Sequence, residues 1–90
     1  MTNSLFIELL KHIRSSINIS NNDLVLSEIY EYLVWLNWSQ VLYNKDYSNY
    51  VSSLESLKKL VLETKDYDEI YGYIADLISC YYLISDENGV

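Results

Sequence analysis

The side chains that could perform chemistry are few in this sequence. The chain has one histidine, His12, and one cysteine, Cys80, among its 90 residues. His12 lies beside Lys11 and off the apolar positions of its segment, which is typical of a solvated histidine, and the sequence places no nucleophile near it. Cys80 follows Ser79 in an apolar segment, where we expect a thiol to act as a small buried hydrophobe. The sequence therefore predicts a protein that is not an enzyme.

Metal and cofactor sites also lack the residues that they need. One cysteine and one histidine cannot supply the four protein ligands of the usual zinc site, and a single cysteine cannot form an internal disulfide. The acidic run Asp66-Tyr67-Asp68-Glu69 offers carboxylates for calcium, but it has neither the spacing nor the glycine of an EF-hand loop. We expect it to begin a helix instead, with Asp66 and Glu69 in a capping box. No glycine-rich phosphate loop or serine elbow occurs, so we predict no metal and no cofactor.

Apolar residues recur at three- and four-residue steps in four segments, which predicts four helices. We expect them from about Ser4 to Asn18, from Asp23 to Tyr43 or Asn44, from a cap at Asp46 through Val61, and from about Asp66 to Asp86. The residues expected to face the core are Leu5, Phe6, Leu9, Leu10, Ile13 and Ile17; Leu26, Ile29, Tyr30, Leu33, Leu36 and Asn37; Tyr50, Val51, Leu54, Leu57, Leu60 and Val61; and Tyr67, Ile70, Ile74, Leu77, Ile78 and Tyr81.

Short connections between these segments predict the fold class. Ile19-Ser20-Asn21-Asn22 is expected to form a connector between the first two helices, and Asn88-Gly89 is expected to cap the end of the fourth. Connections of a few residues make consecutive helices antiparallel neighbours, so residues 1–90 are expected to form a single all-α domain, an antiparallel four-helix bundle. The composition of Ser79 to Ser85 also suits a strand, although the helical period continues through it and no partner strand is visible.

The second helix is apolar on two sides. Leu24, Trp35, Trp38 and Leu42 lie opposite the stripe that contains Leu33, interleaved with acidic residues. Such a helix is either sandwiched at the centre of the bundle or binds something on its outer side. A break at Asn37-Trp38-Ser39, where asparagine and serine could start a new helix, is an alternative.

Charge is the strongest functional signal. The formal net charge is −7, and the excess is concentrated in residues 23–44 and 66–90, which contain no Lys or Arg. This surface repels phosphate backbones and anionic lipid, which disfavours direct binding to nucleic acid or membrane and favours a basic protein partner. The start Met1-Thr2-Asn3-Ser4 lacks the basic segment of a secretory signal, and no apolar run is long enough to cross a bilayer, so we expect a cytoplasmic protein.

Acidic and aromatic residues on the second and fourth helices are the candidate partner-binding residues. If the two helices present them on one side of the bundle, aromatic anchors would supply binding energy and carboxylates would speed encounter. The alternative is that the aromatic side chains pack into the bundle and the carboxylates serve solubility. The candidates are Glu28, Glu31 and Trp35 on the second helix, and Asp68, Glu69, Tyr73 and Asp76 on the fourth.

In size, acidity and helical pattern the chain resembles the immunity proteins of contact-dependent inhibition systems and of nuclease colicins. Asp68 to Tyr73 is loosely similar to the acidic recognition segment and paired tyrosines of the colicin-nuclease class, and no family site can be transferred residue by residue. The resemblance implies an antitoxin that binds and neutralises a basic bacterial toxin, such as a nuclease domain.

Three other functions fit parts of the pattern. A phage-encoded mimic of nucleic acid could inhibit a restriction or CRISPR enzyme, although such mimics usually carry denser and more regular carboxylates than 13 in 90 residues. A bacteriocin immunity protein acting near the membrane would need a larger basic face than Lys11, Arg14, Lys58 and Lys59 provide. A structural or enzyme-subunit role would be favoured by a homodimer that forms through Trp35 and Trp38 and does not depend on salt.

Overall fold

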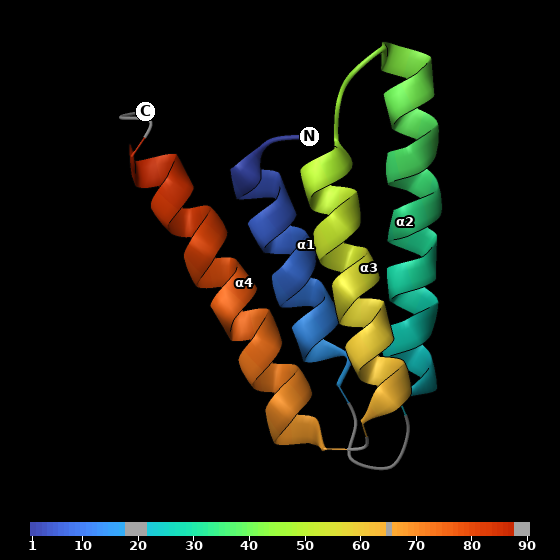
Figure 1. Cartoon of the computed structure of the whole chain (residues 1–90), viewed down its shortest axis with the longest axis vertical. Coiled ribbons are helices and arrows are strands. Elements are labelled where there is room, and N and C mark those ends of the chain that lie inside the picture. The colour runs from blue at the N-terminus through green and yellow to red at the C-terminus, as the bar shows by residue number, and fades with distance from the viewer. Residues whose placement is uncertain (18–21, 65, 88–90) are drawn as a thin grey trace.

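Four helices make up the regular structure of the part of the chain that the computed structural model describes, residues 1–17, 22–64 and 66–87. They are α1 (Asn3–Ser15), α2 (Asp23–Tyr43), α3 (Ser48–Glu63) and α4 (Tyr67–Glu87). The predicted all-α four-helix bundle is confirmed, and Figure 1 shows the chain reversing direction from each helix to the next. The strand considered for residues 79–85 is wrong, because α4 continues through that segment. Residues 19–21 of the connector predicted at Ile19-Ser20-Asn21-Asn22, and the cap at Asn88-Gly89, lie outside the described residues.

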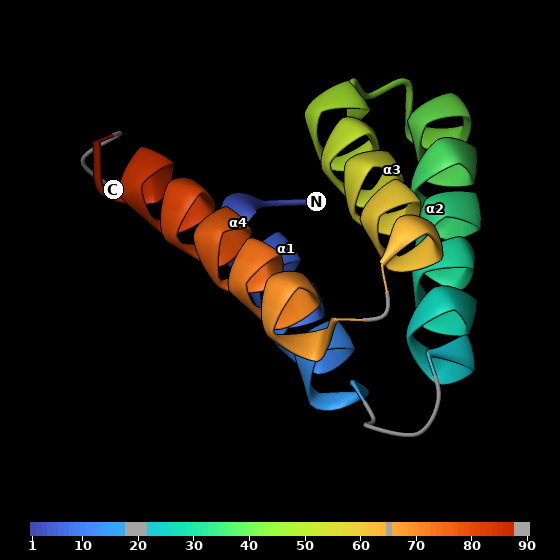
Figure 2. The ribbon, with the colours of Figure 1, turned by 60° about the horizontal axis from the view of Figure 1, so that its bottom comes forward.

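The helices associate as two pairs. α1 packs along α4 and α2 packs along α3, while α3 contacts α4 and α1 contacts α2. Figure 2 shows that the two pairs are inclined to each other. In both views α2 and α4 lie at opposite edges of the molecule, with α1 and α3 between them. α2 is therefore an edge helix, so of the two positions considered for it the sandwiched one at the centre of the bundle is wrong.

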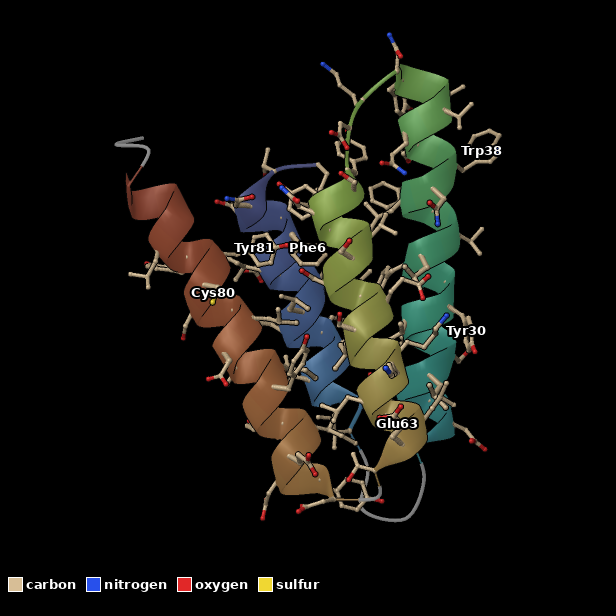
Figure 3. The ribbon with its side chains drawn as sticks, in the orientation of Figure 1. Phe6, Tyr30, Trp38, Glu63, Cys80 and Tyr81 are labelled. Atoms are coloured by element: carbon tan, nitrogen blue, oxygen red, sulfur yellow. The ribbon has the colours of Figure 1, made fainter. Side chains whose placement is uncertain are left out.

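Aromatic rings from three helices meet in the core. Phe6 of α1 is fully buried, and its ring centroid lies 4.7 Å from that of Tyr50 on α3 and 4.8 Å from that of Tyr81 on α4. Figure 3 shows Phe6 and Tyr81 meeting between the helices. The Tyr81 hydroxyl donates to the carbonyl of Asn49 at 3.1 Å and lies 2.8 Å from the hydroxyl of Ser53. These bonds satisfy the polar end of a buried ring, which fixes α4 against α3.

The buried stripes agree with the predicted ones in part. Leu5 of α1 and both Tyr30 and Asn37 of α2 were expected to face the core but are exposed, whereas Val25 and Ser39 of α2 are buried. The error on α2 has a simple cause, because a helix with apolar residues on all sides has no periodic signal that fixes its rotation. The buried hydrophobic residues are Phe6, Ile7, Leu10, Ile13, Val25, Ile29, Leu33, Leu36, Leu54, Leu57, Val61, Ile70, Ile74 and Tyr81.

The break considered at Asn37-Trp38-Ser39 is wrong, because α2 is continuous through it. The side-chain amide of Asn37 donates to the carbonyl of Leu33 one turn earlier, at 2.9 Å, so the side chain bonds within the helix instead of starting a new one. The C-terminal cap of α2 is Asn44, which adopts the left-handed conformation with φ of 52°. Asparagine tolerates this conformation better than other residues with a side chain, which explains why the helix stops here.

Local hydrogen bonds set the starts of α3 and α4. The carboxylate of Asp46 accepts bonds from the backbone N–H and the hydroxyl of Ser48, so it orders the turn before α3, and these bonds lower the pKa of Asp46. Asp66 accepts from the N–H of Asp68, as expected of a cap. Glu69 accepts from the hydroxyl of Thr64, and the N–H of Asp66 donates to the same hydroxyl oxygen. The predicted capping box is therefore replaced by an arrangement in which Thr64 stands between Asp66 and Glu69.

Candidate functional site

A groove of about 550 Å³ lies between α1 and α2. Most of the surface that lines it belongs to apolar and aromatic side chains, and two carboxylates and a histidine are also among the lining residues. We call it the α1–α2 groove, and it is lined by Met1, Leu5, Glu8, Leu9, His12, Glu31, Tyr32 and Trp35. A concave apolar surface with a few polar groups is the usual form of a binding site.

Two carboxylates and one positive group, the amino group of Met1, belong to the residues that line the groove. Glu8 and Glu31 line it from the two helices, and no lining residue is a lysine or arginine. The pKa of the Tyr32 hydroxyl is raised from its ordinary value of 10.0, first by burial and then by the charges of Glu28 and Glu31. Tyr32 therefore remains protonated at neutral pH and can donate a hydrogen bond. Lys11, outside the groove, lies 3.4 Å from Glu8, but both side chains are exposed and such a pair is weak.

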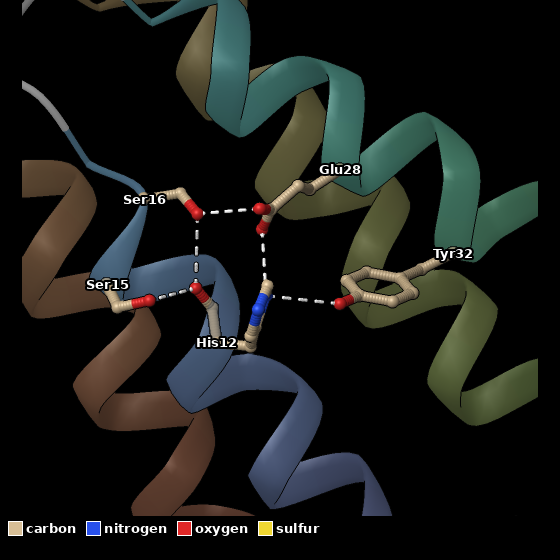
Figure 4. Close-up of polar contacts among 5 residues, drawn as sticks. All are labelled: His12, Ser15, Ser16, Glu28 and Tyr32. Carbon is tan, nitrogen blue, oxygen red and sulfur yellow. Dashed lines mark hydrogen bonds and ion pairs between the residues drawn. The ribbon is translucent and has the colours of Figure 1, made fainter.

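A polar cluster at one end of the groove ties α1 to α2 (Figure 4). Glu28 of α2, whose side chain is only 15% exposed, accepts a hydrogen bond of 2.7 Å from the hydroxyl of Ser16 and lies 3.3 Å from Nδ1 of His12. The Tyr32 hydroxyl lies 3.3 Å from the same nitrogen. We call Ser16, His12, Glu28 and Tyr32 the α1–α2 clamp.

The geometry of the clamp suits a structural role, holding α1 against α2, better than a catalytic one. An activated serine needs its hydroxyl bonded to the histidine, with a carboxylate on the far side of the ring. Here Glu28 stands between Ser16 and His12, so the serine bonds to the carboxylate instead. His12, expected as a solvated histidine, is 64% exposed at the side chain but bonded to α2. No group of three His, Cys, Asp or Glu side chains able to hold a metal exists among the residues with described positions.

Cys80 lies on a different helix from the clamp, and its expected burial is wrong. The thiol is exposed on α4, as Figure 3 shows. The rotation of α4 is fixed by Ile70, Ile74 and Tyr81, which are buried, and Cys80 falls outside their stripe. Neighbouring apolar residues in the sequence therefore did not indicate a buried position for this cysteine.

The seven predicted partner-binding residues fall into two separate groups. Glu31 and Trp35 line the α1–α2 groove, and Glu28 lies in the clamp beside it. The other four are on α4, at the opposite edge of the bundle (Figures 1 and 2). The two helices thus do not combine their acidic faces into one surface.

The α4 residues have local structural roles. Glu69 is bonded to Thr64, and Asp68 donates its N–H to the cap at Asp66. Both lie in the first turn of α4, where a carboxylate stabilises the helix dipole. Tyr73 is partly buried and packs against the core, whereas Asp76 is exposed. Tyr73 thus follows the alternative in which the aromatic side chains pack into the bundle.

Residues that the sequence did not single out complete the candidate site. Glu8, Leu5 and Leu9 join the groove because α1 lies beside α2, a contact that depends on the tertiary structure. A second feature is the outward side of α2, where Trp38 and Val41 are among the most exposed large hydrophobic residues. The two-sided apolar pattern of this helix was the signal for it.

Comparison with known proteins gives no relative: no family model matches the sequence, and no curated protein or solved structure is significantly similar to it. Over the described part of the chain, no helix is both long enough and apolar enough to span a lipid bilayer.

Proposed function

We propose that this chain is an immunity protein or antitoxin that binds a basic bacterial toxin, such as a nuclease domain, in the bacterial cytoplasm and neutralises it. The function is binding, with no catalytic step. The contact surface is the α1–α2 groove, where a cationic side chain of the toxin enters between Glu8 and Glu31 and packs on Trp35. The single observation that carries this proposal is the combination of an apolar lining with two carboxylates from different helices.

The physical properties of the groove suit a lysine or arginine of the partner. Trp35 is 48% exposed, so its ring is available for contact with an incoming guanidinium or ammonium group. Glu8 and Glu31 would pair with that charge, and because both carboxylates are exposed, packing of the charged group on Trp35 would add to a contact that exposed ion pairs alone make weak. The net charge of −7 adds long-range attraction that accelerates encounter with a basic protein.

The arrangement gives less support to the alternative, a mimic of nucleic acid that inhibits a restriction or CRISPR enzyme. A mimic must present negative charges in a continuous row that replaces the phosphate backbone. The acidic residues of α2 and α4 lie at opposite edges of the bundle, so the two acid-rich helices do not form such a row. We therefore prefer the antitoxin.

The first experiment uses the product of the gene next to this one. Its C-terminal domain is expressed with and without the chain, and the surviving cells are counted. We expect the chain to restore survival and the purified pair to associate with a Kd of about 1 nM or below. A neighbouring product that is not a cationic toxin, or a toxic domain that this chain leaves fully toxic, contradicts the proposal.

A matched pair of variants tests the contact surface. The double variant Glu8→Lys/Glu31→Lys changes the net charge by the same amount as Asp68→Lys/Asp76→Lys, but only the first alters the groove. We expect the groove variant to weaken binding about 100-fold or more and the α4 variant to weaken it only a few-fold, mainly through the association rate. Equal losses in the two variants would show that general charge, rather than the groove, determines binding.

The proposal that the chain does not catalyse a reaction has its own test. The purified chain is incubated with DNA, RNA and the toxin domain, and the products are separated on gels. We expect no change in any of them. Turnover that disappears in a His12→Ala variant would contradict this part of the proposal.

A further inference from the structure

The outward side of α2 is an apolar face that remains exposed, although Glu55 and Lys58 of α3 border it. Trp38 and Tyr30 point away from the bundle in Figure 3. Five large hydrophobic residues on this side are between 48% (Tyr30) and 85% (Val41) exposed. We call this set the α2 outer face, and it consists of Tyr30, Val34, Trp38, Val41 and Leu42.

The size of this face is large for a protein of 90 residues. Taking about 150–250 Å² for a whole aromatic side chain and somewhat less for valine or leucine, the exposed fractions correspond to roughly 600 Å² of apolar surface. The largest apolar patch of a typical monomer measures about 300–600 Å² and is often an interaction site. A stable interface buries about 800 Å² on each partner, and the five residues alone provide about three quarters of that area.

The charges around the face indicate what kind of partner covers it. The five residues carry no charge, and α2 contains no lysine or arginine at all. At the border toward α3, Lys58 is already paired with Glu55 at 2.8 Å and lies over the ring of Tyr30 at 5.3 Å. The five side chains themselves offer a cationic partner no carboxylate, and Glu31, one turn before Val34, also lines the α1–α2 groove. An uncharged apolar surface of similar size would match the five residues.

We propose that the α2 outer face binds a second copy of this chain, in a two-fold contact centred on Trp38. The second copy offers the required surface, because its own α2 outer face is uncharged, apolar and equal in area. A two-fold contact also places Trp38 in the interface twice, and buried tryptophans supply much of the energy of interfaces. The α1–α2 groove opens beside Trp35, outside the five residues of the face, so this inference does not depend on the proposed function.

The test is the oligomeric state of the full chain in solution. Sedimentation velocity is measured from about 1 to 100 μM, a range that brackets ordinary homodimer affinities. We expect a dimer that tightens as NaCl is raised from about 50 to 500 mM, because salt screens the repulsion between two chains of charge −7 and leaves the apolar contact intact. Binding of a basic toxin in the groove should weaken over the same range, so the two proposals can fail separately.

Two variants and a control locate the contact. Trp38→Glu and Val41→Glu should each weaken the dimer about 100-fold or more, because the introduced charge enters the interface twice. Tyr82→Glu on α4, which alters an aromatic side chain of comparable exposure (59%, against 66% for Trp38), should leave the dimer intact. Far-UV circular dichroism confirms that each variant is folded, and Val41, the more exposed position, provides the second measurement if Trp38→Glu unfolds.

Three results would overturn the inference. The first is a wild-type chain that remains monomeric at the highest concentration. The second is a dimer that resists both charge substitutions on α2. The third is self-association that continues past the dimer to larger species, which a closed two-fold contact does not allow.

Discussion

Replacing Glu28 by alanine is expected to lower the free energy of unfolding by about 2 kcal/mol. The carboxylate joins α1 to α2 through Ser16 and His12, and its side chain is only 15% exposed. α1 and α2 share a limited contact compared with the α1–α4 pair, so this polar bridge has a large share in holding them together.

The magnitude follows from the two contacts of Glu28. A hydrogen bond to a charged acceptor contributes about 1.5–3 kcal/mol, and the partly exposed bond from Ser16 at 2.7 Å belongs at the lower end of that range. The contact between Glu28 and Nδ1 of His12 at 3.3 Å adds at most about 1 kcal/mol, because the His12 side chain is 64% exposed. Glutamine at this position keeps an acceptor for Ser16 and should cost about half as much as alanine.

The assay is urea unfolding followed by circular dichroism at 222 nm. Glu63→Ala, which removes an exposed carboxylate from the C-terminal end of α3, is the matched control and should change stability by no more than about 0.5 kcal/mol. A double-mutant cycle with Ser16→Ala isolates the bond itself and should give a coupling energy of about 1 kcal/mol. If Glu28→Ala costs no more than Glu63→Ala, or if the coupling energy is zero, the clamp does not support the α1–α2 contact.

Three further outcomes can be checked on the purified chain. Phe6→Ala removes the fully buried ring between Tyr50 and Tyr81 and should cost about 3–5 kcal/mol, measured as a large fall in Tm. Asn44→Ala should cost about 1 kcal/mol in urea unfolding, because φ is 52° there, while Asn44→Gly should change stability by only a few tenths. Burial, followed by the neighbouring tyrosines, raises the pKa of Tyr50 from its ordinary value of 10.0, so the folded chain holds this proton more tightly than the unfolded chain. That stability is fully present below about pH 10 and is lost as pH rises through the raised pKa, so Tyr50→Phe should flatten the loss measured by urea unfolding between about pH 9 and 11.

Local sequence signals determined the helices themselves. The three- and four-residue recurrence of apolar residues predicted four helices, and α2 begins and ends within the predicted limits at Asp23 and Tyr43. Asp66 was recognised as the cap of α4 because the short carboxylate that satisfies a free backbone N–H is a local feature. The existence of helices depends mainly on neighbours in the chain, which is why it could be predicted without the tertiary structure. Their ends were predicted less well, because α1 stops at Ser15 instead of about Asn18 and α3 is capped at Tyr47 instead of Asp46.

The candidate site was predictable only in its chemistry. Glu31 and Trp35 were identified from charge and aromatic character, but they were expected to share a surface with α4 residues such as Asp76, whereas they line the groove together with Glu8 on α1. Which helices lie side by side depends on how apolar surfaces from distant segments fill a common core. Periodicity within one helix contains no information about that choice.

The sequence by itself determined that the chain is acidic, helical and supplied with more apolar surface on α2 than one core needs. The tertiary structure decided where that excess surface lies. Because α2 packs at the edge of the bundle against α1 and α3, its second apolar side faces outward, and Trp38 and Val41 remain exposed. The same packing separates α2 from α4, so the acidic charge that the sequence concentrates on these helices is divided between two opposite edges of the molecule.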